Sequence, residues 1–325
     1  MTQSLRDAPR VRTSASPAQQ LRTTTAAVRV SLRWLGVRKT LTPDQKTQAA
    51  ESFGAEGEFL SASKKLLDTR HPAYKEVTAV RGQVLAYWKG CTLPYPEPGV
   101  RLIRQRDVEP FNQKLVELRE ELRNAVARLD RHYGELQSAA EQRLGRLYNP
   151  ADYPPTLEGL FEIDWDWPSV EPPAYLMQLS PELYEQERLR VAARFEEAVK
   201  LTEQAFISEF AKLVAHLTER LSTGNDGQPK VFRDSAVANL TEFFERFRSI
   251  SVRSNEELDA LVDRAKRVVQ GVDAQDLRDN TSLRQEVAEQ LSRIQTAVDG
   301  MVIEQPRRRI IRSTSSNGSH HAANH

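Results

Sequence analysis

The 325-residue sequence predicts a mainly α-helical protein: an elongated antiparallel hairpin of two long helices, additional shorter helices and a small two-stranded β ribbon. Apolar residues recur at gaps of three and four from Phe111 to Leu147, which is the period of a straight α-helix. A similar stripe begins at Ser180-Pro181 and continues to about Leu221. Two short segments instead alternate apolar and polar residues, which is the period of a β-strand.

The two long stripes predict the hairpin. Each stripe covers one side of its helix, so each helix needs a partner that buries it. We expect the hairpin over about 107–222, with the connector 149–180 at its tip. The domain organisation expected is a disordered basic arm over 1–25, one elongated helical domain over 26–302, and a disordered tail over 303–325.

Capping signals and breaks place the shorter elements. Thr42 and Gln45 form a predicted capping box with Pro43 at the first helical position, and Ser254 and Glu257 form a second box. The segment CTLPYPEPG, residues 91–99, predicts a loop because it holds three prolines and a glycine. The remaining helices, including the C-terminal set over about 233–302, are expected at 42–67, 72–90, 234–248, 254–270 and 281–302.

The connector contains LFEIDWDW, residues 160–167, in which aromatic and branched residues alternate with acids. One interpretation pairs it with VRVSLRW, residues 28–34, so that Arg29 and Arg33 oppose its acids in a two-stranded ribbon. The other interpretation is an exposed protein-docking face at the hairpin tip. Its residues would be Phe161, Asp164, Trp165, Asp166 and Trp167.

Charge is balanced overall but uneven along the chain. The formal net charge is +1, which gives no global electrostatic argument for nucleic-acid binding. The first 41 residues carry eight Arg or Lys against one acid, whereas residues 148–187 carry nine acids and no Arg or Lys. The basic ends therefore support an alternative, non-specific contact with phosphates. The arginines concerned are Arg6, Arg10, Arg12 and Arg22, with Arg307, Arg308, Arg309 and Arg312 in the tail.

The sequence predicts no catalytic, cofactor-binding or metal-binding residue. Both glycine-rich phosphate-binding patterns are absent. The pair Asp164 and Asp166 has no third metal ligand nearby, and His71, His132 and His216 are scattered. We expect Cys91, the single cysteine, to be an inert thiol. No apolar run is long enough for a membrane span and the N-terminus lacks a secretory apolar core, so we expect a cytoplasmic protein that is not an enzyme.

Several blocks resemble a bacterial and phage family of mainly helical proteins known as a domain of unknown function. The blocks are RVSLRWLGVRKTLTPDQ, KKLLDTRHPAYKEVTAVRGQVLAYWKGCTLPYPEPGVRLI, YPPTLEGLFEIDWDW, VFRDSAVANLTEFFERFRSI and DAQDLRDNTSLRQEVAEQL, within residues 26–302. Such proteins are similar to ones encoded on mobile elements near MoxR-type AAA ATPases and von Willebrand A-domain proteins. The resemblance implies an adaptor or structural partner and transfers no active-site residue.

The hypothesis from the sequence is a non-catalytic helical scaffold or adaptor that binds other proteins, with a MoxR-type AAA ATPase as one partner. The alternative is a nucleic-acid-binding protein that uses its basic arms. The oligomeric state stays open. Phe243, Phe244 and Phe247 are either core or dimer contacts, and the core is the favoured interpretation.

Overall fold

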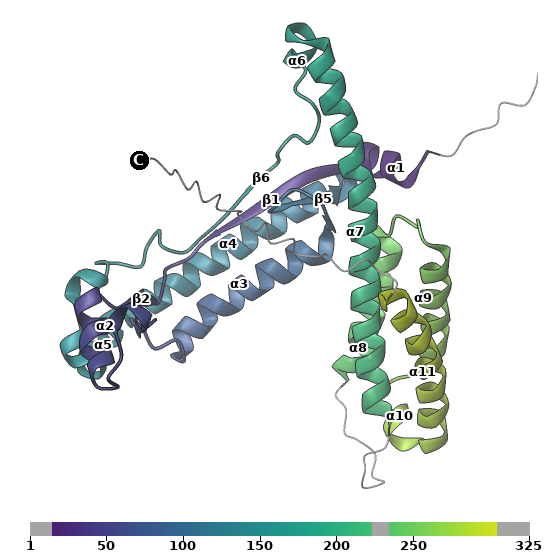
Figure 1. Cartoon of the computed structure of the whole chain (residues 1–325). Helices are drawn as coiled ribbons and strands as arrows, with labels where there is room; N and C mark the ends of the chain where they lie inside the picture. Colours follow the sequence, from purple (N-terminus) through teal and green to yellow (C-terminus); the bar gives the residue numbers. More distant parts are fainter. Residues whose placement is uncertain (1–14, 223–233, 304–325) are drawn as a thin grey trace, which may run out of the picture. The chain divides into compact units, whose positions relative to one another are not determined.

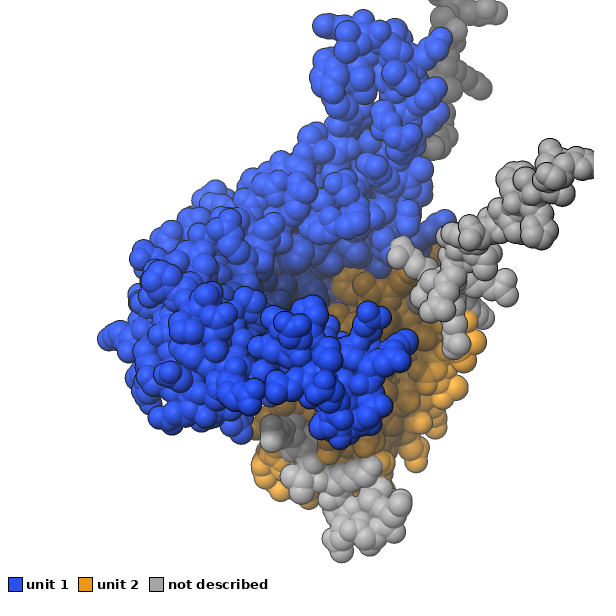
Figure 2. Space-filling model, turned by 60° about the vertical axis from the view of Figure 1, so that its left-hand side comes forward, with its two compact units in different colours: residues 1–203, 245–254 blue, residues 204–244, 255–325 orange. Residues whose placement is uncertain are grey.

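The computed structural model describes residues 15–222 and 234–303, and most of them lie in α-helices (Figure 1). The mainly α-helical fold class is therefore confirmed. Contacts group the chain into two compact units, residues 1–203 with 245–254 and residues 204–244 with 255–325 (Figure 2). The single domain expected over 26–302 stays a prediction. The disorder expected within 1–14 and 304–325 falls outside the described residues.

The first unit contains a four-stranded antiparallel sheet in the order β4–β5–β1–β6. The ribbon expected between VRVSLRW and LFEIDWDW is present as the β1–β6 pair, and β5 and β4 extend the sheet on the other side of β1. A separate two-stranded ribbon joins β2 to β3. The strands are β1 (Thr25–Arg33), β2 (Arg38–Thr40), β3 (Ser63–Lys65), β4 (Leu93–Pro94), β5 (Val100–Arg104) and β6 (Glu162–Asp166).

The helix α4 (Val108–Arg131) forms the centre of the first unit. It packs along α3 (Pro72–Cys91), and it also contacts β6 (Figure 1). The predicted apolar stripe is the buried face of α4, and burying each large apolar side chain stabilises the fold by roughly 1.5–3 kcal/mol. These buried residues are Phe111, Leu115, Leu118, Leu122, Ala125 and Leu129.

The long helix expected to reach Leu147 is two helices, because the chain breaks at His132. His132 has φ −96° and ψ 0°, and its backbone N–H donates to the Leu129 carbonyl at 3.0 Å. The stripe continues in α5 (Tyr133–Leu144), where Tyr133, Leu136 and Ala140 are buried. Periodicity did not reveal the break, since no residue is inserted there. The observed partners of α4 are α3 and β6, and the pairing of the two long helices with each other stays a prediction.

The N-terminal third of the chain differs from the prediction in two places. Residues 17–24, expected in the disordered arm, form α1 (Pro17–Thr24), whose capping box joins Ser16 and Gln19. The helix expected over 42–67 ends much earlier, as α2 (Pro43–Glu51), although its predicted capping box is confirmed. Gly54, at φ 62°, lies just beyond α2, and the chain then turns into the 3₁₀ helix η1 (Gly57–Phe59) and β3.

The second long helix is confirmed as α7 (Pro181–Leu221), which follows the short α6 (Tyr175–Leu179). The shorter C-terminal helices are also present, although the cap of α9 is Asn255, which accepts from the Leu258 N–H at 2.9 Å, rather than Ser254. In the second unit, Phe243 and Phe244 are buried and Phe243 stacks on Phe210. The remaining helices are α8 (Ser235–Ile250), α9 (Glu256–Val269), α10 (Asp276–Asp279) and α11 (Thr281–Ile303).

Candidate functional site

The acidic side of β6 faces two arginines of β1. The register pairs Arg29 with Asp166 and Arg33 with Glu162, as the ribbon interpretation predicts. Arg29 binds Asp166 through two hydrogen bonds of 3.1 and 3.0 Å, and Arg33 lies 2.7 Å from a Glu162 oxygen. The Arg29 guanidinium holds the pKa of the Asp166 carboxyl below its usual range. Both acids are thus matched by charge within the sheet.

The aromatic side of β6 faces α4 rather than solvent. Phe161 and Ile163 are buried, and the Phe161 ring meets the Trp34 ring edge-on at 5.1 Å. Trp165 donates from its indole N–H to the Asn112 side-chain oxygen at 2.9 Å. Phe161 and Trp165 therefore contribute to packing within the first unit, and the docking-face interpretation stays a prediction.

Asp164, Asp166 and Trp167 are the exposed members of the residues predicted for docking. Trp167 is 39% exposed and its ring lies edge-on to Phe111 at 6.2 Å. Asp164 is exposed and lies opposite Ser31 in the register. The five predicted residues lie in or next to β6 but divide between the core, an ion pair and the surface.

A groove lies between α4 and β6, with a volume of about 660 Å³. We call it the α4–β6 groove. One wall consists of residues 158, 159 and 161–164, which belong to the turn before β6 and to the strand. The other wall follows one row of α4, spaced at three and four residues. Its side chains on that wall include Arg119, Leu122, Arg123, Val126, Ala127 and Asp130.

The edge of β6 beside the groove has no strand paired to it. In the part of the chain that the structure describes, β6 is the last strand of its sheet and β1 is its single neighbour. An edge strand exposes backbone N–H and C=O groups that can pair with another chain. The groove therefore combines an unpaired strand edge with a side wall from a buried helix.

Asp130 fixes the turn that leads into β6. Its carboxylate accepts from the Leu157 backbone N–H at 2.8 Å and from the Thr156 hydroxyl at 3.4 Å. Gly159 then adopts φ 72°, a conformation that other residues rarely take. The end of β6 is held to α4 by these contacts, so the groove is built on packed elements.

Some of the charged side chains that line the groove have a partner, and others do not. Arg119 lies over the Trp165 ring at 4.8 Å, and Arg123 forms an ion pair with Glu120 at 3.3 Å. Within residues 15–222 and 234–303, neither Asp164 nor Glu158 has a side-chain partner for a hydrogen bond or an ion pair from its carboxylate. The free charge beside the edge of β6 is therefore negative.

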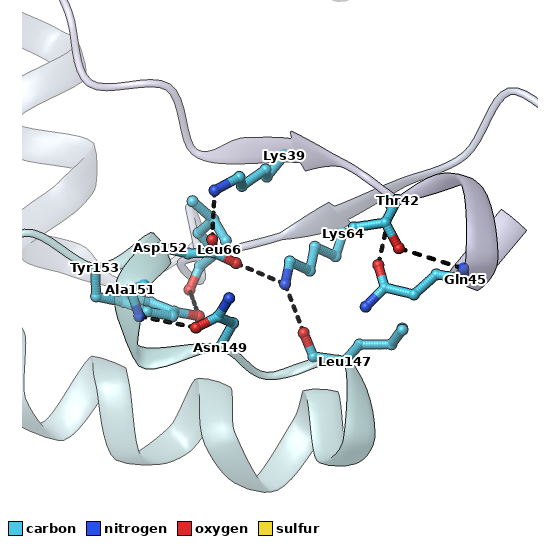
Figure 3. A network of polar contacts seen from close by, with 10 residues as sticks. All are labelled: Lys39, Thr42, Gln45, Lys64, Leu66, Leu147, Asn149, Ala151, Asp152 and Tyr153. Carbon is cyan, nitrogen blue, oxygen red and sulfur yellow. Dashed lines mark hydrogen bonds and ion pairs between the residues drawn. The ribbon is translucent and has the colours of Figure 1, made fainter.

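A buried ion cluster holds the segment before β6 to the β2–β3 ribbon (Figure 3). The Asp152 carboxylate lies 2.5 Å from the Lys39 ammonium and 2.6 Å from the Lys64 ammonium, which also donates to the Leu147 carbonyl at 2.6 Å. Lys39 and Lys64 hold the pKa of Asp152 below its usual range. One carboxylate thus binds two ammonium groups, and these contacts anchor the segment before β6 to the ribbon.

Other candidates from the sequence do not converge on a site. Burial raises the pKa of the Cys91 thiol, which disfavours its reactive thiolate. The His71 and His132 rings lie 5.1 Å apart, whereas His216 belongs to α7. No three His, Cys, Asp or Glu side chains of the described residues are grouped to hold a metal ion. None of the described helices is long and apolar enough to cross a membrane.

The arginines of the nucleic-acid alternative are mostly outside the structure. Arg307, Arg308, Arg309 and Arg312, like the arginines of residues 1–14, fall outside the described residues. Arg22 is described, and it forms an ion pair with Glu171. The described residues thus provide no basic surface built from these arms.

No family model, curated protein or solved structure matches this chain.

Proposed function

We propose that this chain is a non-catalytic helical scaffold or adaptor that binds other proteins, and that the α4–β6 groove is its binding site. The unpaired edge of β6 beside the groove carries the proposal. Proteins bind extended segments at such edges by backbone hydrogen bonds, and adjacent pockets select the side chains. The groove volume of about 660 Å³ lies in the range of roughly 300–1,000 Å³ typical of ligand sites.

The resemblance described above suggests the kind of partner. We propose a cytoplasmic role beside an AAA ATPase of the MoxR type in a system carried by a phage or a mobile element. An elongated hairpin of α4–α5 with α7, if formed in solution, would present the groove at a distance from other bound proteins. Small-angle X-ray scattering tests that shape, since a compact particle contradicts it.

Affinity capture from the native host, with nuclease treatment and mass spectrometry, tests the proposed function. The variants are Asp164→Lys in the groove and Glu141→Lys as the control, since Glu141 is an exposed acid of α5 that does not line the groove. We expect a protein partner that resists nuclease, is lost with Asp164→Lys and is kept with Glu141→Lys. Capture that disappears with nuclease, or that neither variant changes, contradicts the proposal.

A further inference from the structure

We infer that the α4–β6 groove binds an extended peptide in which apolar and basic residues alternate, and that this peptide adds a strand to the free edge of β6. The inference rests on the proposed function and names the chemistry of the ligand. A helical ligand is the alternative occupant, and backbone methylation of the peptide separates it from an added strand.

The first support is the strand that β6 already binds. On its paired edge β6 lies against residues 29–33 of β1, which with Val28 read VRVSLR and alternate apolar residues with Arg29, Ser31 and Arg33. The two arginines reach Asp166 and Glu162. A strand offers the same two rows of side chains to neighbours on both of its edges. The free edge therefore favours the same alternation.

The second support is the free negative charge. Asp164 lies opposite Ser31, which carries no charge, and it has no side-chain partner within the described residues. A basic side chain on an added strand would reach Asp164 across the free edge of β6. Glu158, at the end of the groove, offers a second carboxylate. The groove is lined by four acids, Asp130, Glu158, Glu162 and Asp164, against two arginines, Arg119 and Arg123, so its net negative charge favours a cationic ligand.

The third support is the helix wall. Side chains of an added strand alternate, so every second residue would point toward α4. There the wall offers Val126 and Ala127 together with the buried Leu122. Apolar residues suit these positions, and the five residues of β6 set the length of the matching strand to about 17 Å. The ligand therefore needs apolar side chains in the row that faces α4 and basic side chains in the row that faces Asp164.

Synthetic peptides test the pattern directly. The probe is a fluorescein-labelled VRVSLR peptide, and the charge-swapped control is VEVSLE, both titrated by fluorescence anisotropy against the full chain. In a register shifted by two residues from that of β1, one arginine of VRVSLR lies opposite Asp164. We expect VRVSLR to bind about threefold to tenfold more tightly than VEVSLE, because this attractive pair becomes repulsive in VEVSLE. Failure of VRVSLR to bind, or equal binding of both peptides, overturns the inference.

Backbone methylation tests strand addition. Methyl groups on alternate amide nitrogens of VRVSLR block one edge of the peptide, and methyl groups on the other alternate set block the opposite edge. A ligand that adds to β6 needs one edge, so one methylated peptide should bind like VRVSLR and the other should not bind. Equal binding of both methylated peptides overturns strand addition and points to a side-chain or helical mode.

Charge reversal in the protein locates the site. Asp164→Asn should weaken VRVSLR about twofold to fivefold, and Asp164→Lys should weaken it further and strengthen VEVSLE, whereas Glu141→Lys should change neither. Unchanged affinities in both Asp164 variants overturn the assignment to this edge. A native partner that depends on Asp164 while VRVSLR does not bind would keep the proposed function and refute only the ligand class.

Discussion

Removing the carboxylate of the buried ion cluster should destabilise the first unit by about 3 kcal/mol, because truncating one partner of a buried pair costs roughly 3–5 kcal/mol. In Asp152→Ala the Lys64 ammonium, whose side chain is 6% exposed, keeps only the Leu147 carbonyl. The lower end of that range applies because Lys39 is 56% exposed and can be hydrated again. The loss is therefore mainly the cost of an unpaired Lys64.

The assay is urea unfolding followed by tryptophan fluorescence. All four tryptophans, at positions 34, 88, 165 and 167, belong to the first unit, so the signal reports that unit. With a urea dependence of about 1–3 kcal/mol/M, the midpoint should fall by about 1–3 M. Adding Lys64→Met to Asp152→Ala should recover about 1–3 kcal/mol, since the unpaired charge is then removed.

The same pair of proteins gives a pH dependence with a defined sign. The pKa of Asp152 is lowered in the folded state, so its stabilising contribution is present above about pH 4 and is lost as the pH falls through the folded pKa. The stability difference between wild type and Asp152→Ala should therefore narrow in acid. The reasoning is refuted if Asp152→Ala costs less than about 1 kcal/mol, or if Lys64→Met does not rescue it.

Three further predictions concern packing, a helix end and the thiol. Leu129→Ala, at a fully buried position of α4, should cost about 2–5 kcal/mol in the fluorescence assay, whereas Val116→Ala, 43% exposed on the same helix, should cost under about 0.5–1 kcal/mol. Equal effects would contradict the assigned face of α4. Arg284→Ala should destabilise the second unit by about 1–3 kcal/mol in circular dichroism, because Arg284 donates to the carbonyls of Leu221 and Arg220 at 2.8 and 2.9 Å. An unfolding transition with an unchanged midpoint would show that the C-terminal end of α7 does not need the hydrogen bonds from Arg284. Cys91 should react with a thiol reagent at pH 7 more slowly in the folded chain than in urea, because burial raises its pKa. Equal reaction rates in the folded and the unfolded chain would contradict the burial of the Cys91 thiol.

Elements with a one-sided apolar stripe were predictable from local sequence. The stripes of α4, α5 and α7 are the buried faces of those helices, because a period of 3.6 places such residues on one side whatever lies opposite. The break at His132 was not predictable in this way, since the stripe continues through it. The early end of α2 has a local signal in Gly54, which lies just beyond the helix at φ 62°.

The sheet was only partly predictable, because its pairs join distant residues. The complementary charges of residues 28–34 and 160–167 predicted the β1–β6 pair, and the observed register joins Arg29 to Asp166. β5 was missed, although Val100, Leu102 and Ile103 are apolar, because five residues after a proline-rich loop give a weak signal.

The groove itself could not be predicted from the sequence. It needs α4 to lie beside β6, and no local pattern places Arg119 over Trp165 or Asp130 at the turn before the strand. The sequence did direct attention to residues 160–167, but it could not separate the packed residues of this segment from the exposed ones. Trp165 packs against α4, whereas Asp164 is the accessible residue.

The acidic side chains of β6 also disfavour one kind of partner, which is a second copy of the same strand. An uncovered strand edge invites self-pairing between copies and hence aggregation. If two copies of β6 met antiparallel about their middle residue, Asp164 would face Asp164, and like charges directly opposite are destabilising. The carboxylate that would attract a cationic segment thus keeps two copies of the same edge apart.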